Sequence, residues 1–187
     1  MKKKILVVAA VAICLAIATT GTLAYFTYSD KADNVITTGG VNIELVEKTQ
    51  REDGTLVDFP EEGIQRVMPG TDVSKIVSVK NTGKNGAWVR VKVELKITSS
   101  DGAELPVNVM KFEVGENWSV EPDGFIYYAK PVEAGASTGI LFDTVHIAPE
   151  MGNEYQHCTA NIEISAQAVQ TANNGNTVME AAGWPEA

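Results

Sequence analysis

The side chains best suited to chemistry in this sequence are two histidines and one cysteine in its C-terminal third. His146 lies in a run of alternating residues, and His157 is followed directly by Cys158. Imidazole and thiolate groups are common zinc ligands, so these three residues could in principle hold a metal ion. A peptidase of the H-E-x-x-H type needs two histidines one helical turn apart beside a glutamate, and the sequence lacks that pattern. The simpler interpretation is an exposed histidine on a strand and a His-Cys pair in a turn, and we expect neither metal nor cofactor.

Patterns typical of other kinds of catalysis are also missing from the sequence. No G-x-S-x-G or comparable motif marks a serine nucleophile. Asp53-Gly54, Asp101-Gly102 and Asp123-Gly124 are typical of turns and lack the carboxylate spacing of a calcium loop. The pieces TTGG and NTGKNG do not lead into a helix through Lys-Ser/Thr, as a phosphate-binding loop does. We therefore expect that the protein is not an enzyme.

Three aromatic residues are candidates for contact with a partner. Trp88 faces outward by the alternation of its strand, whereas Tyr127 and Tyr128 are neighbours that point to opposite faces, so one of the two should be exposed. Such side chains could bind sugars or begin a protein contact. Alternatively, a loop such as 50–70, or the C-terminal tail with Trp184, covers them. The sequence leaves both interpretations open.

The segment around Trp88 is the clearest strand of the chain. AWVRVKVELKI, Ala87–Ile97, alternates apolar and polar residues over eleven positions, which is typical of a half-buried β-strand. The preceding segment SKIVSVKN ends in a Gly/Asn-rich turn and is therefore predicted to pair with it as a hairpin. Further strands are predicted at 41–48, 109–114, 124–132, 140–147 and 159–169.

Seven or eight strands without a long amphipathic helix predict an all-β fold. Two antiparallel sheets, in a sandwich of jelly-roll type, would bury so many one-sided strands. The acidic segment Gln50–Gly70 is predicted to be a long loop excursion, and the tail to contain a short helix around Val178–Ala182. The predicted organisation is a signal peptide (1–24), an N-terminal arm (25–40), a β-sandwich domain (41–170) and a polar tail (171–187).

The beginning of the chain has the three-part pattern of a secretory signal peptide. Three lysines precede 14 apolar residues, Ile5–Ala18, and small residues follow up to Ala24. The apolar run is shorter than the roughly 20 residues that span a bilayer. We therefore expect cleavage between Ala24 and Tyr25 and only transient contact with the membrane, the alternative being an uncleaved anchor.

Cleavage at this position would leave a strongly acidic protein. The remaining 163 residues carry 12 basic and 24 acidic side chains, a net charge of −12. Such a charge is repelled by nucleic acid phosphates and by anionic membrane surfaces, so we expect neither as a partner. Only Cys158 would remain of the two cysteines, which excludes a disulfide within the mature chain.

The residues around the cut resemble the N-terminus of the TasA/camelysin family of exported Gram-positive proteins. GTLAYFTYSDKADNVITTGGVNIEL contains a G-T-x-A box, an aromatic residue and a Ser-Asp pair, and then the pattern N-x-x-x-x-G-x-x-x-(I/L)-x-L. MPGTDVSKIVSVKNTGKNGAWVRVKV, and LFDTVHI with AQAVQ, look like the same family. Tyr28 before Ser29-Asp30 and the acidic excursion depart from the fibre-forming pattern. No zinc-ligand motif of the family's peptidases matches this sequence.

The resemblance implies a jelly-roll protein of the extracellular biofilm matrix, exported through a dedicated signal peptidase. Its subunits would assemble into fibres by strand donation, in which the N-terminal segment of one subunit completes the sheet of the next. The partner would be another copy or a related matrix protein. The sequence is compatible with this, because β-forming residues precede a Gly39-Gly40 hinge. These residues are Tyr25, Phe26, Tyr28, Val35 and Ile36.

Other interpretations of the arm and of the function stay open. The arm 25–38 could be a disordered lead-in or could fold back on its own sheet. The whole protein could instead be a binding or accessory module that docks to another fibre protein or to cell-wall glycan. A cell-surface metallopeptidase that uses His146, His157 and Cys158 is the least favoured of the alternatives.

Overall fold

The computed structural model describes residues 26–37, 40–61 and 63–185, with the backbone alone described for 26–37 and for 65 and 66. The predicted signal peptide, including Ala24, lies outside the described residues, as do Tyr25 and Gly39. Within the described part of the chain, no helix combines the length and the apolar character needed to cross a bilayer.

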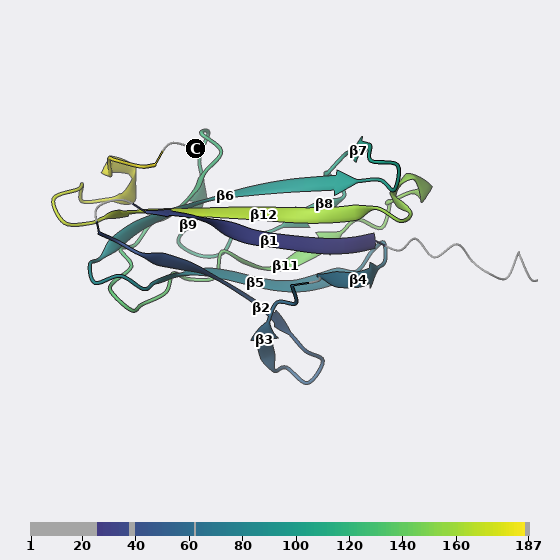
Figure 1. The fold of residues 1–187 in the computed structure, drawn as a ribbon, viewed down its shortest axis with the longest axis horizontal. Coiled ribbons are helices and arrows are strands. Elements are labelled where there is room, and N and C mark those ends of the chain that lie inside the picture. The colour runs from purple at the N-terminus through teal and green to yellow at the C-terminus, as the bar shows by residue number, and fades with distance from the viewer. Residues whose placement is uncertain (1–25, 38–39, 62, 186–187) are drawn as a thin grey trace, which may run out of the picture.

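The described residues form two β-sheets packed face to face (Figure 1). In spatial order, sheet A consists of β4 (Ile64–Val67), β1 (Phe26–Thr37), β12 (Thr159–Gln170), β6 (Ala87–Thr98), β10 (Ile126–Tyr128) and β9 (Trp118–Val120), and β7 (Glu104–Leu105) pairs with the end of β6. Sheet B consists of β3 (Leu56–Asp58), β2 (Ile43–Gln50), β5 (Asp72–Asn81), β11 (Phe142–Ile147) and β8 (Met110–Phe112). The prediction of an all-β, two-sheet sandwich is confirmed.

The core lies between the sheets and is built from the alternating positions that the sequence indicates. The longest pairing joins β12 to β6 in antiparallel register, from Thr159 opposite Thr98 to Gln170 opposite Ala87. Burying these apolar side chains stabilises the fold by about 25 cal/mol per Å² of surface removed from water. The fully buried residues of these two strands are Ala87, Val89, Val91, Ile97, Ala160, Ile162, Ile164, Ala166 and Ala168.

The predicted hairpin between SKIVSVKN and the strand after it is wrong. The first segment is β5, which pairs with β2 and β11 in sheet B, whereas β6 belongs to sheet A. The connection is a corner held by the buried Asn81 side chain, whose Nδ2 donates to the carbonyls of Asn85 and Val132, each at 2.8 Å. The Asn81 Oδ1 accepts from the Gly83 amide at 2.9 Å. The Gly/Asn-rich segment therefore moves the chain between sheets instead of reversing it within one.

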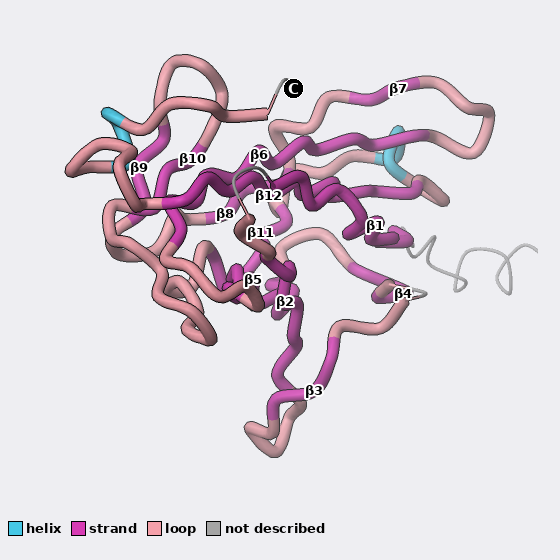
Figure 2. The backbone as a smooth tube through the Cα atoms, turned by 60° about the vertical axis from the view of Figure 1, so that its left-hand side comes forward, coloured by secondary structure: helices cyan, strands magenta, loops and turns pink. Residues whose placement is uncertain are grey.

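The predicted acidic excursion, 50–70, contains two short strands. A turn around Gly54, which has a φ of 82°, connects β2 to β3. The resulting hairpin projects from the body of the sandwich (Figures 1 and 2). The chain then returns as β4 to pair with β1 in sheet A. The short helix predicted in the tail is the 3-10 helix η2 (Val178–Glu180), and a second one, η1, spans Asn153–Tyr155.

Candidate assembly site around strand β1

The N-terminal arm forms strand β1 within the chain's own sheet. It pairs in parallel with β12, from Thr27 opposite Thr159 to Thr37 opposite Ala168, with a register shift between Lys31 and Asn34. The alternative in which the arm folds back on its own sheet is therefore the one found in this structure, and the picture of a free arm in the monomer is corrected. Phe26, Tyr28, Val35 and Ile36 all lie on β1; Tyr25 lies outside the described residues.

The two edges of β1 are paired very differently. Along one edge β12 accompanies the strand for most of its length, whereas on the other edge β4 pairs only at Phe26 and Tyr28. Beyond Tyr28, no strand among the described residues pairs with this second edge. Figure 1 shows the long β1–β12 contact in sheet A and the short β4 at one end. Much of the β1 backbone is thus held from one side only.

Strand β2, in the other sheet, is similarly open on the side away from β5. It pairs with β3 only over Lys48–Gln50, and no described strand continues this pairing toward Ile43. The chain passes from β1 to β2 through residues 38–42, where Gly40 has a φ of 74°. A residue with a Cβ rarely adopts that conformation. The backbone at position 40, in the predicted hinge, therefore favours glycine. This side of the sandwich therefore carries incompletely paired strands in both sheets.

Such an arrangement can exchange or add strands. An unpaired edge presents N–H and C=O groups in a row, and a strand from another chain can satisfy them. β1 is the first strand of the described chain, and along most of its length only one of its edges is paired. The candidate site is therefore the slot between β4 and β12, together with the unpaired edge of β1.

The two histidines and the cysteine are not gathered into one site among the described residues. His146 is on β11, where its Nδ1 is 2.7 Å from the Asp72 carboxylate at the surface. His157 has a φ of 59° in the turn after η1, and Cys158 beside it is fully buried. Burial raises the pKa of the Cys158 thiol, which disfavours the thiolate needed for metal binding or nucleophilic attack. The described residues contain no group of three or more histidine, cysteine, aspartate or glutamate side chains placed to hold a metal ion.

The three aromatic residues predicted as a surface contact are all buried. Tyr127 and Tyr128 do point to opposite faces, but their exposed fractions are 6% and 8%, and that of Trp88 is 4%. Tyr128 packs in the core, with its ring 4.9 Å from that of Trp118. Trp88 and Tyr127 lie on the outer face of sheet A beneath residues 171–185, which we call the C-terminal strap. The alternative of a cover that includes Trp184 is thus the one found.

The strap is fastened to the outer face of sheet A through specific polar contacts. The Trp88 Nε1 donates to the Asn174 carbonyl at 3.0 Å, across 86 residues of chain. The Trp184 ring meets the Tyr127 ring edge to face, at 6.0 Å between centroids. Figure 2 shows the strap beside β9 and β10. These contacts leave the aromatic residues unavailable to a sugar or to a protein partner.

Arg90 is the residue that sequence reasoning missed at this place. Its guanidinium carbon lies 3.8 Å from the Phe125 ring centroid and 4.7 Å from that of Trp184. Its Nε donates to the Gln167 Oε1 at 2.8 Å and its Nη1 donates to the Tyr127 hydroxyl at 3.0 Å. Strand alternation places an outward charge at position 90, which ordinarily indicates only a solvated surface. The sequence contains no local signal for the cover that stacks upon it.

Comparison with family models, with curated proteins and with solved structures found no match to this chain.

Proposed function

We propose that this protein is a secreted structural subunit of an extracellular biofilm matrix and that it assembles into fibres by exchange of strand β1. In a fibre, β1 of one subunit occupies the slot between β4 and β12 of the next. Each subunit then donates one strand and receives one. Such a head-to-tail contact does not close on itself, so it propagates as a filament.

The observation that supports this proposal most is the position of β1 itself. It is the first described strand, it is paired along β12 on one edge, and its other edge is mostly unpaired. Exchange replaces the hydrogen bonds to β12 by the same bonds in the neighbouring subunit. The main barrier is therefore the release of β1 and the opening of the connection through Gly40. The signal-peptide pattern and the resemblance of residues 21–45 to the TasA/camelysin family support export and the matrix role.

A reversible covalent lock of β1 tests strand exchange. Lys31 and Glu163 are register partners on β1 and β12, and Glu163 is exposed on the outer face. Neighbouring strands hold their Cα atoms within the distance range that a disulfide spans. We expect the protein with Lys31→Cys and Glu163→Cys, oxidised as a dilute monomer, to form no fibres, and to form them again after reduction.

Matched variants make this test selective. Each variant with only one of the two introduced cysteines, treated with the same oxidant, should polymerise like the protein without substitutions. Oxidation of the double variant after assembly should produce a ladder of disulfide-linked subunits on a non-reducing gel, because the two cysteines then belong to different chains. Normal polymerisation of the locked monomer would show that β1 does not exchange.

The intact mass of the protein recovered from culture medium tests export. Cleavage after Ala24 leaves a chain that begins at Tyr25, and its mass follows from the printed sequence. We expect this species in the medium and the longer chain only in cells. A cell-associated protein that keeps residues 1–24 would contradict the secreted subunit, irrespective of the result for strand exchange.

The alternative function, a binding or accessory module that docks to another fibre protein or to cell-wall glycan, has less support from the structure. It depended on exposed aromatic residues, and Trp88, Tyr127 and Tyr128 are buried.

A further inference from the structure

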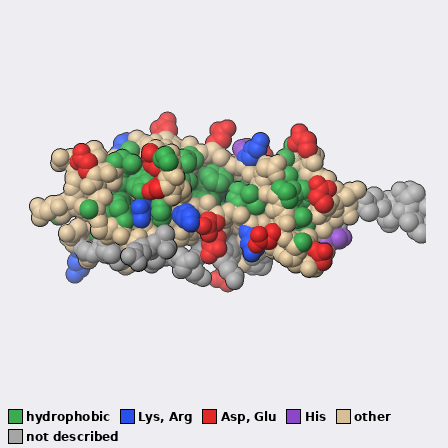
Figure 3. Space-filling model, turned by 90° about the horizontal axis from the view of Figure 1, so that it is seen from above, with side chains coloured by type: hydrophobic (Ala, Val, Ile, Leu, Met, Phe, Trp, Pro, Cys, Tyr) green, Lys and Arg blue, Asp and Glu red, His purple; other side chains and the backbone are tan. Residues whose placement is uncertain are grey.

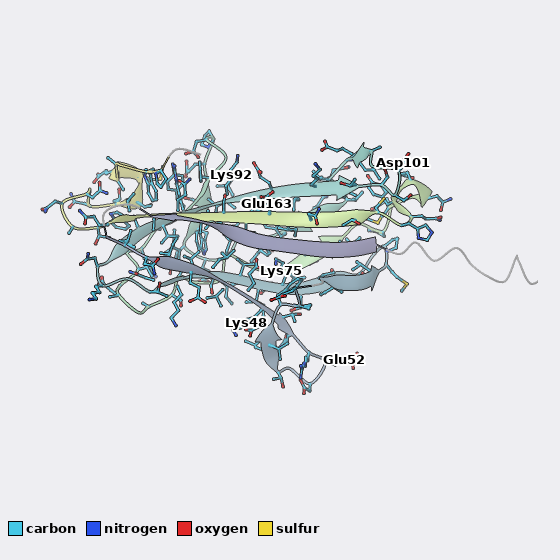
Figure 4. All side chains as sticks on the ribbon, in the orientation of Figure 1. Lys48, Glu52, Lys75, Lys92, Asp101 and Glu163 are labelled. Atoms are coloured by element: carbon cyan, nitrogen blue, oxygen red, sulfur yellow. The ribbon has the colours of Figure 1, made fainter. Side chains whose placement is uncertain are left out.

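The interior of the sandwich contains one lysine in an unusual position. Lys75 on β5 is fully buried, and its inward-facing neighbours on the same strand are Val73 and Val77, which are 5% and 0% exposed. Figure 4 shows Lys75 within the body of the sandwich, away from the projecting hairpin that carries Glu52. Lysine is almost never fully buried unless its charge is paired. The side chain therefore has a specific role in this interior.

The carboxylate of Glu47 on β2 lies directly against the Lys75 amine. The Lys75 Nζ is 3.0 Å from the Glu47 Oε1, and the exposed fractions of the two side chains are 0% and 10%. The register of β2 and β5 pairs Glu47 with Val77, so Lys75 and Glu47 are diagonal neighbours on adjacent antiparallel strands. The Lys75 Nζ also lies 4.0 Å from the centre of the Phe59 ring. A nucleophilic amine and a carboxyl group are thus held together in a largely dry site.

This environment disfavours the two charges and favours close approach of the two groups. Moving an ammonium and a carboxylate out of water carries a desolvation penalty that their mutual attraction offsets only in part. Condensation to an amide removes both charges. Fixing two reacting groups in contact also supplies a high effective concentration, which an intermolecular reaction lacks.

We propose that Lys75 and Glu47 form an intramolecular amide bond after folding. One proton passes from the Lys75 ammonium to the Glu47 carboxylate, and the neutral Nζ attacks the carboxyl carbon. A C–N bond forms, and the bond from that carbon to one carboxyl oxygen breaks. The two protons that the ammonium loses depart with this oxygen, so that an ammonium and a carboxylate become one amide and one water molecule. The reaction requires no oxidant, no cofactor and no second protein. The partly exposed side of Glu47 provides the route by which the water leaves.

The bond would tie together two strands at the base of the excursion. It closes the loop between Glu47 and Lys75, which contains β3, β4 and the projecting hairpin. A covalent link of this kind restricts the unfolded chain in the way a disulfide does. Cys158 is a free, buried thiol, so this link would serve where a disulfide within the mature chain is excluded.

The mass of the protein without substitutions tests whether the amide bond forms. The full chain is expressed with export, recovered folded, denatured and weighed, and its N-terminus is determined separately. We expect a mass lower than the calculated one by one water molecule. Trypsin should then release a branched peptide in which the segment ending at Lys48 is joined to Val67–Lys80, with Lys75 uncleaved. A mass equal to the calculated value would overturn the proposal, and a loss of ammonia would overturn the assignment of Glu47.

Two variants separate this bond from ordinary ion pairing. Lys75→Arg keeps the positive charge but lacks the amine, so its mass should equal the calculated value. Lys48→Arg is the matched control, because Lys48 makes an equally close contact, 2.9 Å to Asp58, at an exposed site where both charges stay hydrated. This control should still lose one water molecule. Loss of the mass difference in Lys48→Arg, or its retention in Lys75→Arg, would contradict the link at Lys75.

Discussion

Arg90 shows how an outward-facing residue of a strand acquires a nearly buried environment. Only 11% of its side chain is exposed, because Phe125 and Trp184 stack on the guanidinium group and Tyr127 and Gln167 accept its hydrogen bonds. A planar, permanently charged group can stack and hydrogen-bond at the same time, which a lysine cannot do. Arg90 is therefore the residue that joins the strap to sheet A.

Replacing Arg90 should destabilise the protein more than replacing its charged neighbour on the same face. Arg90→Met removes hydrogen bonds to a charged group, each contributing about 1.5–3 kcal/mol, and the aromatic stacking. We expect a loss of about 2–4 kcal/mol in the free energy of unfolding, measured by urea denaturation. Lys92→Met is the control, since its pair with Glu94 is exposed and contributes about 0–1 kcal/mol. Equal losses in the two variants would refute a special role for Arg90.

The pKa of Asp123 should report the integrity of the same cluster. Burial raises the pKa of this carboxyl, but hydrogen bonds from the Tyr127 hydroxyl, at 2.7 Å, and from the Phe125 amide, together with the Arg90 charge, lower it below its usual value. Tyr127→Phe should raise the pKa of Asp123, as observed by NMR titration. Tyr128→Phe, on the opposite face, should leave it unchanged; a shift in that variant instead would contradict the assigned hydrogen bond.

This lowered pKa also gives the direction of a pH effect on stability. A carboxyl group with a lower pKa in the folded state stabilises the fold above its unfolded pKa, near 3.8. The contribution is lost as pH falls through the lower folded value. Tyr127→Phe should therefore show a smaller loss of stability than the unmodified protein between neutral and strongly acidic pH. The carboxyl is partly exposed, so the difference is small.

At the scale of elements, the folded shape of the C-terminal strap depends on the hydrogen bonds of one side chain, that of Asn174. The Asn174 Nδ2 donates to the carbonyls of Gln170 and Ala182, at 3.1 and 3.0 Å, and its Oδ1 accepts from the Ala182 amide at 2.8 Å. These bonds fold the strap back on itself before it reaches Trp184. The strap adds no strand to the sheet, so its attachment depends on few contacts.

Asn174→Ala should open the strap without unfolding the sandwich. Three hydrogen bonds are lost, each contributing about 1 kcal/mol, so local opening should become about a hundredfold more frequent. Amide hydrogen exchange at Ala182 should speed up accordingly, while exchange in β6 and β12 stays slow. Asn176→Ala is the control, because in the described structure this exposed residue contributes only its backbone amide to a hydrogen bond. Faster exchange in β12 as well would show that the strap is part of the cooperative core.

The alternation of apolar and polar residues determines which features of the strands the sequence could predict. Alternation located β6 correctly, at Ala87–Thr98 against the predicted Ala87–Ile97, because each residue's face depends on its own burial. Periodicity carries no information about which strand lies beside which. The pairing of β5 with β2 and β11, and the parallel pairing of β1 with β12, therefore could not be predicted. The strap over Trp88 could not be predicted either, because Asn174, which accepts the Trp88 hydrogen bond, lies 86 residues away in the sequence.

For the whole molecule, charge is the property that governs encounters between copies. Acidic and basic side chains are scattered over the face shown in Figure 3, with hydrophobic groups between them, and no large patch of one sign is visible there. The net charge of the full chain is −9, and it becomes −12 after the predicted cleavage. Two copies therefore repel one another at long range, although their surfaces have polar and apolar groups that can meet at short range.

Assembly should for this reason become faster as salt is added. Raising the ionic strength from about 0.01 to about 0.15 M shortens the screening length from about 30 to about 8 Å, which removes most of the long-range repulsion between exposed charges. We expect light scattering of the mature protein to rise sooner at the higher salt. It should rise sooner again as pH falls toward the isoelectric point, which lies below the full-chain value of about 4.7 because the cut removes three lysines. Sodium sulfate at the same ionic strength is the control, since sulfate also strengthens apolar association. If chloride and sulfate act equally, screening is the cause. Slower assembly at higher salt would mean that attraction between charged groups drives the contact, and repulsion between acidic subunits would then not be the barrier.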